Sequence, residues 1–125
     1  MSAEPQIRYA TSADGTRIAY AVESGTPPAV LLIWGWPQTI GAPYGMPVVP
    51  KRTIVQFDRR GMGASSRDVQ DISIERQVED VASIVTALGG QPIDIRANWD
   101  GTPIAIAFAA AQPEYFADGD WLSAL

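Results

Sequence analysis

An uninterrupted apolar run from Ala29 to Trp34 constrains the fold of this chain more than any other feature. The run follows two prolines and stops at Gly35. A strand of this composition is typical of a parallel sheet, because such a sheet is covered on both faces. A second strand of this kind, Thr53 to Phe57, ends in a glycine-containing loop. These two segments predict a parallel sheet at the centre of the molecule.

The first part of the chain predicts an antiparallel hairpin. Two short strands are expected over Ile7 to Ala10 and Arg17 to Val22. Between them Asp14-Gly15 supplies a tight turn that tolerates positive φ. The central sheet is therefore expected to be entered through this hairpin.

Two helices are expected after the central strands. Ser73 can cap a helix whose apolar residues recur at helical spacing until Gly89. A short strand from Pro92 to Ala97 follows, and then a helix from Thr102 to Ala111 with a proline in its first turn. Strands that alternate with helices predict an α/β sheet, and 125 residues predict one domain over residues 1–125.

Two segments depart from this pattern. The segment 35–52 holds four prolines, so we expect an irregular connection there in place of a crossover helix, and one face of the sheet can lack cover. In the strand before Ala97, Asp94 and Arg96 alternate with isoleucines. The face that carries these two side chains is either exposed to solvent or holds the two side chains as an ion pair.

Composition excludes several kinds of chemistry. The chain has no cysteine and no histidine, which removes thiol and imidazole catalysis together with thiolate and imidazole metal ligands, and we predict neither metal nor cofactor. A net charge of −5 argues against a nucleic-acid partner. No run is long enough for a membrane span and no signal peptide is apparent, so a cytoplasmic protein is expected.

The pentapeptide Ala97-Asn98-Trp99-Asp100-Gly101 lies between a predicted strand and a predicted helix. A sharp turn at such a junction needs small residues on either side of its apex. Ala97 and Gly101 meet this need and centre the turn on Trp99, whose indole cannot act as a nucleophile. Centring the turn on Asp100 places Asn98 and Thr102 at the flanks, which is sterically poorer.

Nearly all of the chain resembles the N-terminal half of an α/β-hydrolase. The resemblance rests on the Asp-Gly hairpin and on three segments that follow it: Leu31-Leu32-Ile33-Trp34-Gly35-Trp36-Pro37, Phe57-Asp58-Arg59-Arg60-Gly61-Met62-Gly63-Ala64-Ser65 and Thr102-Pro103-Ile104-Ala105-Ile106-Ala107. It implies a truncated, mostly parallel α/β-hydrolase-like sheet. It also implies that the backbone N–H groups of Trp36 and Asp100 form an oxyanion hole.

The chain departs from this family at its reactive positions. Trp99 stands where the family has serine, or aspartate in the dehalogenase and epoxide hydrolase branches, which often read Asp-Trp-Gly. Here the order is Trp99-Asp100-Gly101, which moves the carboxylate off the apex. The family's catalytic acid and histidine follow later strands, and this chain has no histidine at all. A Ser-His-Asp triad is therefore impossible within it.

Two carboxylates are the candidate catalytic groups. Asp100 and Asp58 are both expected at the carboxyl edge of the sheet, where α/β sites form. The resemblance implies that one strand lies between theirs, so the two strands would lie about 10 Å apart at ~4.8 Å per spacing. The alternative for Asp100 is a residue stabilised by the helix dipole. The alternative for Asp58 is an ion pair or loop hydrogen bond with Arg59 or Arg60.

Tryptophans are expected at the same edge. Trp34, Trp36 and Trp99, with Asn98, are the candidate substrate-binding residues: the three indoles either form a floor for an apolar or sugar-like ligand or plug a vacated site. Ser65 and Ser66 are explained by hydrogen bonding in the turn.

We predict a hydrolase-family protein whose own chain lacks the triad. Any activity would be carboxylate-based hydrolysis of a glycoside, epoxide or ester-like small molecule by Asp100 and Asp58. The alternatives are a catalytically inactive binding or interaction protein, or a fragment of a longer α/β-hydrolase. An unpaired edge strand or the uncovered sheet face also predicts a homo-oligomer.

Overall fold

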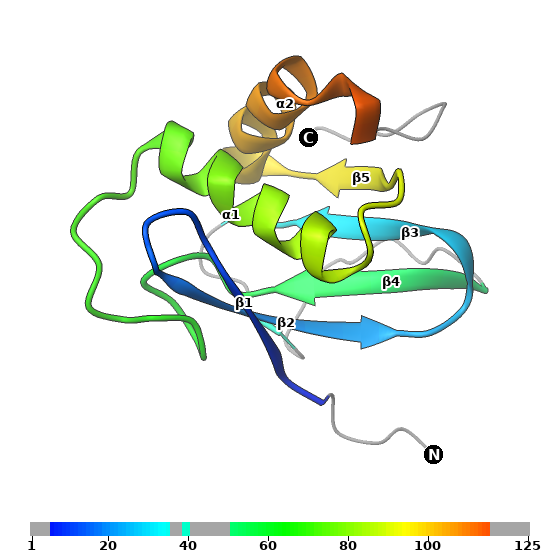
Figure 1. Ribbon diagram of the computed structural model, residues 1–125, viewed down its shortest axis with the longest axis horizontal. Helices are drawn as coiled ribbons and strands as arrows, with labels where there is room; N and C mark the ends of the chain where they lie inside the picture. Colours follow the sequence, from blue (N-terminus) through cyan, green and yellow to red (C-terminus); the bar gives the residue numbers. More distant parts are fainter. Residues whose placement is uncertain (1–5, 36–38, 41–50, 116–125) are drawn as a thin grey trace.

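The computed structural model describes residues 6–35, 39–40 and 51–115. They form one five-stranded sheet and two helices (Figure 1). The elements run in the order β1 (Arg8–Thr11), β2 (Arg17–Glu23), β3 (Thr26–Ile33), β4 (Arg52–Phe57), α1 (Ile74–Ala87), β5 (Asp94–Ala97) and α2 (Thr102–Ala111). A single 3-10 turn, Trp99–Gly101, joins β5 to α2, and another, Pro113–Tyr115, follows α2.

The sheet is mixed, with strand order β1-β2-β4-β3-β5. The hairpin strands β1 and β2 are antiparallel, and β2 is antiparallel to β4. Strand β3 is parallel to both of its neighbours, β4 and β5. The expected parallel centre entered through a hairpin is thus confirmed. Because β3 lies between β4 and β5, the carboxyl ends of all three parallel strands meet at one edge.

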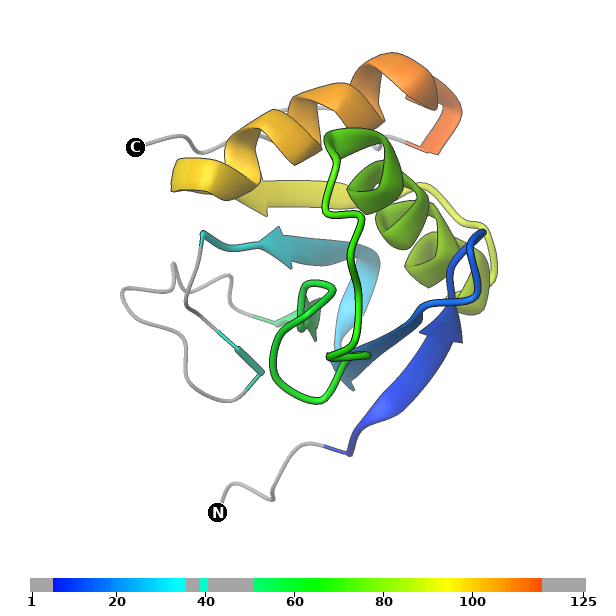
Figure 2. The ribbon, with the colours of Figure 1, turned by 90° about the vertical axis from the view of Figure 1, so that its left-hand side faces the viewer.

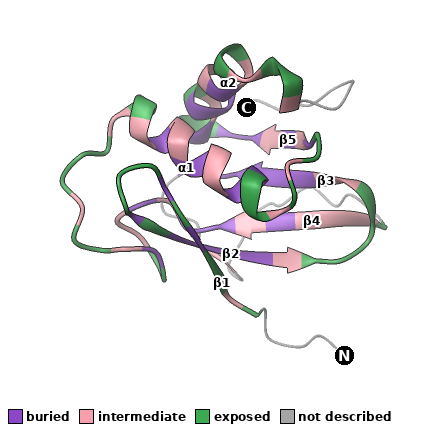
Figure 3. Ribbon diagram, viewed as in Figure 1, coloured by how far each residue is buried: buried purple, intermediate pink, exposed green. Residues whose placement is uncertain are grey.

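One face of the sheet carries the main core. Figures 1 and 2 show α1 and α2 on this face, α1 across the middle of the sheet and α2 beside β5. Figure 3 colours continuous stretches of β2 and β3 as buried, whereas buried and intermediate residues alternate at the end of β4 and in β5. Apolar side chains from every element make up this core, including Ile18, Leu31, Val55, Val81, Ile84, Ile95, Ile104 and Phe108. Helix α1 contacts α2 as well as β1 and β2.

A second, smaller cluster lies on the opposite face of the sheet. Val30, Leu32 and Trp34 are buried there, with Ile54 packed against them. Asp94 lies on this face and pairs with Arg52 at 2.7 Å. One expected alternative was that Asp94 and Arg96 pair with each other, and this alternative is wrong because Asp94 pairs with Arg52. The proline-containing connection between β3 and β4 lies largely outside the described residues.

The two helices differ in how their sequences define them. Helix α1 begins at the predicted cap, where the Ser73 hydroxyl accepts a hydrogen bond from the Arg76 N–H, and it is followed by Gly89 at φ 103°. Helix α2 is apolar on nearly every side, although only Ile104, Ala105 and Phe108 are buried. In the described part of the chain, neither helix is long and apolar enough to cross a membrane.

Candidate active site at the carboxyl edge of the sheet

The ends of β3 and β5 are joined by Asn98. Its side-chain oxygen accepts a hydrogen bond from the Gly35 N–H at 2.8 Å, and its own N–H donates to the Ile33 carbonyl at 3.3 Å. Asn98 is buried. We predicted this residue as substrate-binding, and the structure places its carboxamide as a clamp between the two strand ends.

The backbone bends sharply at Trp99. This residue has φ 47°, a left-handed conformation that is rare for a bulky side chain. A Cβ on Gly101 would lie 2.1 Å from the Ile33 carbonyl oxygen, so only glycine fits beside the end of β3. A Cβ on Gly35 would lie 2.8 Å from the Cβ of Trp99. The prediction that small neighbours centre the bend on an indole is confirmed.

The tryptophans of this edge lie in different surroundings. Trp99 is 60% exposed, so its indole does not plug the site. Trp34 is only 9% exposed and belongs to the buried cluster under β3 and β4. Trp36, expected both as a substrate-binding side chain and as a backbone donor, lies outside the described residues. Within the described part of the chain, the available aromatic surface at the bend is that of Trp99.

Asp100 directly follows the apex and precedes α2. Its carboxylate accepts a hydrogen bond from Arg59 at 2.9 Å, and its side chain is 54% exposed. Arg59 also donates through Nε to the Gln77 side chain of α1 at 3.0 Å. The bend is therefore tied to the loop after β4 and, through that loop, to α1.

Asp58 is turned into the protein. It is 3% exposed, and its two carboxylate oxygens accept hydrogen bonds from the Ile40 and Ala64 N–H groups, each at 2.8 Å. A Cβ on Gly63 would lie 2.2 Å from this carboxylate, which explains the glycine at φ 53°. The loop hydrogen bond foreseen as an alternative exists, but its donors are backbone groups and not Arg59 or Arg60. The structure does not join Asp58 to Asp100.

Arg60 forms a buried charge cluster that links three elements. Its side chain is 1% exposed and contacts Asp80 of α1 at 2.7 Å and Asp14 of the hairpin turn at 2.9 Å. The Arg60 guanidinium holds the pKa of Asp14 well below its usual range by hydrogen bonding to the carboxylate. Hydrogen bonding to Asp80 raises the pKa of Arg60. This cluster fixes the loop after β4 in place.

The serines of that loop anchor it to β2. The Ser65 hydroxyl accepts a hydrogen bond from the Ala19 N–H at 2.8 Å and donates to the Asp58 carbonyl. The Ser66 hydroxyl accepts from the Arg17 N–H at 3.0 Å. Hydrogen bonding thus accounts for both hydroxyls, although their partners are strand and loop backbone groups.

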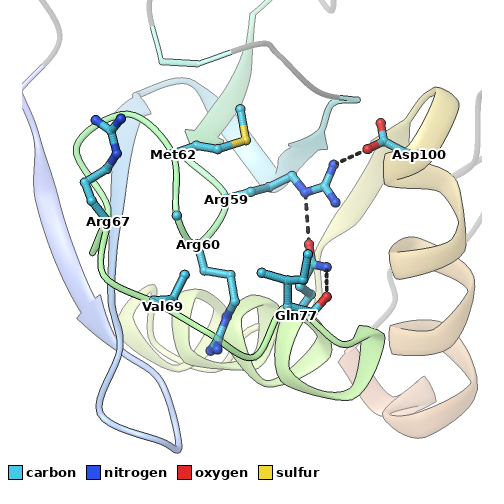
Figure 4. Close-up of a pocket in the computed structure, with 9 residues that line it drawn as sticks. Arg59, Arg60, Met62, Arg67, Val69, Gln77 and Asp100 are labelled. Carbon is cyan, nitrogen blue, oxygen red and sulfur yellow. Dashed lines mark hydrogen bonds and ion pairs between the residues drawn. The ribbon is translucent and has the colours of Figure 1, made fainter.

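A hollow of about 380 Å³ lies between this loop, α1 and the bend. Figure 4 shows Arg59 reaching from the loop toward Asp100, with Arg67 and Met62 on the other side. Its wall holds three arginines, one carboxylate and several apolar side chains: Arg59, Arg60, Gly61, Met62, Arg67, Val69, Ile72, Gln77 and Asp100. This hollow was not predicted from the sequence. The adjacent Arg59 and Arg60 indicated a local concentration of positive charge, but the sequence does not show that their side chains point in opposite directions.

Among the described residues, no group of three acidic, cysteine or histidine side chains is placed to hold a metal ion. The site consists of an exposed indole, a carboxylate paired with arginine and a hollow with a basic wall.

No protein-family profile matches the sequence, and no curated protein matches it either. Solved structures do. The chain is similar to an α/β-hydrolase from Sphaerobacter thermophilus, with 35% identity and a TM-score of 0.70 over 83% of this chain and 40% of that one. It is also similar to a bacterial membrane phospholipase A, with 25% identity and a TM-score of 0.77 over 97% of this chain and 39% of that one.

An epoxide hydrolase from Vigna radiata is similar in fold, with a TM-score of 0.72, 20% identity, and coverage of 90% of this chain and 38% of that one. The chain thus spans about 40% of the length of these proteins. The strand order, the bend after β5 and these similarities agree with one another. The chain has the N-terminal half of the α/β-hydrolase fold, with an indole at the apex where the resemblance leads one to expect a nucleophile.

Proposed function

We propose that this chain is a non-hydrolytic binding protein built on the α/β-hydrolase fold, and that it takes a small organic ligand at the carboxyl edge of its sheet. The observation that carries the proposal is the exposed indole of Trp99 at a left-handed backbone position. An indole has no atom that forms an acyl or alkyl intermediate, but it offers a large flat surface for stacking.

The surroundings of the bend support binding more than catalysis. Asn98, predicted to bind substrate, and Asp58, predicted to be catalytic, are both buried, and their side chains accept hydrogen bonds from backbone N–H groups. Acid–base hydrolysis needs a proton donor and acceptor within hydrogen-bond reach of the reacting atoms. Among the described residues, Asp100 is the exposed carboxylate beside the apex, and it is paired with Arg59.

The second candidate function is hydrolysis by Asp100. It is favoured by one observation, the half-exposed carboxylate next to the apex. In this scheme Asp100 would act on an epoxide, ester or glycoside that stacks against Trp99. The fold similarity to an epoxide hydrolase fits this candidate but does not select it.

One experiment separates the two candidates. Esters, epoxides, haloalkanes and nitrophenyl glycosides are added to the protein while product and tryptophan fluorescence are both measured. Because the chain has four tryptophans, the Trp99 signal is taken as the difference between the wild type and Trp99→Phe. We expect at least one compound to quench the Trp99 emission without forming product.

The Asp100→Asn variant is the control for catalysis. Product that forms with the wild type and disappears with Asp100→Asn would replace the binding proposal by the second candidate. An unchanged Trp99 signal across the panel, with no product, would contradict both.

A further inference from the structure

We propose that the ligand at this edge is an organic cation, whose methylated ammonium group lies against the indole of Trp99 beside the carboxylate of Asp100. This inference rests on the proposed binding function and specifies the charge of its ligand. The side chains of both residues are more than half exposed. The bend therefore presents an aromatic surface and a carboxylate to solvent from two consecutive residues.

The position of Gly35, next to the end of β3, shows that these two side chains lie close together. A Cβ on Gly35 would lie 2.6 Å from Oδ1 of Asp100 and 3.4 Å from Cε3 of Trp99. Oδ1 and Cε3 are therefore separated by no more than the sum of these two distances, about 6 Å. The carboxylate and the six-membered ring of the indole thus adjoin the same backbone position, and the lack of a side chain on Gly35 leaves room for both.

An exposed indole next to a carboxylate is suited to a cation. A cation within about 6 Å of an indole centroid is attracted by the negative charge of the ring face, and quaternary ammonium groups are recognised in this way. The carboxylate adds an attraction of the same sign. A quaternary ammonium group donates no hydrogen bond, so it can lie beside Asp100 while Arg59 keeps its hydrogen bond to Oδ2 at 2.9 Å. Figure 4 shows the other oxygen of Asp100 turned away from Arg59.

The charges around the bend favour a cation over an anion. Asp100 and Arg59 neutralise each other as a pair, so their surroundings decide the sign of the charge. Arg60 meets two carboxylates inside the protein, and Asp58 adds a further carboxylate whose hydrogen bonds come from backbone N–H groups. Arg67 lies on the far side of the loop after β4, as Figure 4 shows. With a net charge of −5 on the whole chain, the field attracts cations to this edge.

A bare metal ion does not fit this arrangement. Hard divalent cations take several oxygen ligands at once. In the part of the chain that the structure describes, no three acidic, cysteine or histidine side chains are grouped to supply them. A methylated ammonium group binds through its surface instead of through coordination bonds. The ligand that suits the bend is therefore an organic cation.

The test uses three probes of similar compact shape and different charge: tetramethylammonium, tert-butanol and pivalate. Each is added to the intact chain at constant ionic strength. Binding is measured by NMR through the backbone N–H signals of Gly35 and Gly101. A probe that lies over the ring face also has its own methyl signal shifted upfield. We expect this upfield shift for tetramethylammonium, which should bind at least ~5-fold more tightly than tert-butanol. Pivalate should bind more weakly than tert-butanol.

Variants separate the ring from the carboxylate. Trp99→Leu keeps an apolar side chain, and it should abolish the upfield shift and weaken tetramethylammonium binding at least ~5-fold. Asp100→Asn should weaken it at least ~3-fold and leave tert-butanol binding unchanged. Arg59→Gln should have the opposite effect and strengthen tetramethylammonium binding, because it removes a positive charge beside Asp100.

The matched control is Glu114→Gln. Glu114 is an exposed residue of the 3-10 turn that follows α2, and its loss changes the net charge as much as Asp100→Asn does. We expect Glu114→Gln to bind tetramethylammonium like the wild type. The signals of the buried core methyl groups check that each variant is folded.

The possible failures are distinct. If tert-butanol binds as tightly as tetramethylammonium, or pivalate more tightly, the binding function stands and the cation inference is wrong. The cation inference also fails if Asp100→Asn binds tetramethylammonium like the wild type, or weakens it no more than Glu114→Gln does. If none of the probes changes any signal, the inference is overturned, and the panel of neutral compounds described above decides separately whether the binding function survives.

Discussion

At the scale of single residues, Trp99 combines an unfavourable backbone conformation with an exposed side chain. For residues other than glycine, the left-handed region raises the free energy by about 1–2 kcal/mol. An exposed indole recovers only part of this through packing. Gly35 and Gly101 leave the space in which the end of β3 lies against the bend, and this packing holds Trp99 in its conformation.

Replacing Trp99 by glycine should therefore stabilise the fold. We expect Trp99→Gly to raise the free energy of unfolding by up to about 1 kcal/mol, because glycine adopts positive φ without steric strain. Urea unfolding followed by circular dichroism measures the change. Trp34→Gly, at a buried position, should instead destabilise by about 3–5 kcal/mol. A loss above about 1 kcal/mol for Trp99→Gly would indicate that the indole supports the bend.

Gly101, unlike Trp99, stands where no side chain can be accommodated. Gly101→Ala brings a Cβ within 2.1 Å of the Ile33 carbonyl oxygen and should destabilise by about 1–3 kcal/mol or more. Gly89→Ala is the comparison: beyond its own chain neighbours the added Cβ would meet no atom within 4 Å, and only the positive φ of 103° opposes it. Thermal unfolding should rank Gly101→Ala as the more damaging change. Equal losses would contradict the crowding argument.

At the scale of elements, the buried Arg60 cluster joins the hairpin turn, the loop after β4 and α1. Removing one partner of a buried ion pair typically destabilises by about 3–5 kcal/mol, because the remaining charge loses its partner inside the protein. We expect a loss of this size for Arg60→Met in chemical unfolding. Arg76→Met, which removes a half-buried arginine of α1 that lies 3.9 Å from Asp14 at the margin of the cluster, should change stability by less than about 1 kcal/mol.

The same cluster makes stability depend on pH. The pKa of Asp14 is lowered in the folded state by its hydrogen bond from Arg60. Its contribution is therefore complete above the unfolded value of about 3.9 and is lost as the pH falls below it toward the folded pKa. Wild type and Asp14→Asn should differ by a constant free energy of unfolding from pH 7 to 5, and the difference should shrink below pH 4. A difference that grows on acidification would contradict this assignment.

The elements themselves were largely predictable, because their signals are local. The Ser73 cap and the spacing of apolar residues located α1, and the bounds of α2 agree with the sequence expectation. Strand β3 begins at Thr26, ahead of the expected Ala29, although prolines follow. The pairing with β4 shifts between Thr26 and Val30, so the prolines occupy positions where regular ladder donors are not needed.

The candidate site was less predictable, because it depends on which partner each charge meets. Asp58, Arg59 and Arg60 are consecutive, yet they contact backbone N–H groups, Asp100 and the pair of Asp14 and Asp80 respectively. No pattern in the local sequence distinguishes these outcomes. The bend, in contrast, was predictable because the size of its neighbours decides it.

At the scale of the whole molecule, β5 pairs with β3 alone among the described strands. The homo-oligomer expected from the sequence stays a prediction. If two copies pair through this edge strand, the register of the pairing can be specified. Antiparallel contact between two copies of β5, with Ile95 opposite Ile95, sets Asp94 opposite Arg96 twice. We expect a dimer by light scattering at tens of micromolar, weakened by Arg96→Glu. A strict monomer at this concentration would contradict it.

Helix α2 bears on how this protein behaves in solution. Its only polar side chain is that of Thr102, and Ile106 and much of its alanine surface face outward. Removing such an apolar surface from water is favourable, so it promotes both specific and non-specific contacts. The protein is therefore expected to adsorb to hydrophobic resin and to brighten dyes such as ANS while fully folded, so neither behaviour should be taken as a sign of misfolding.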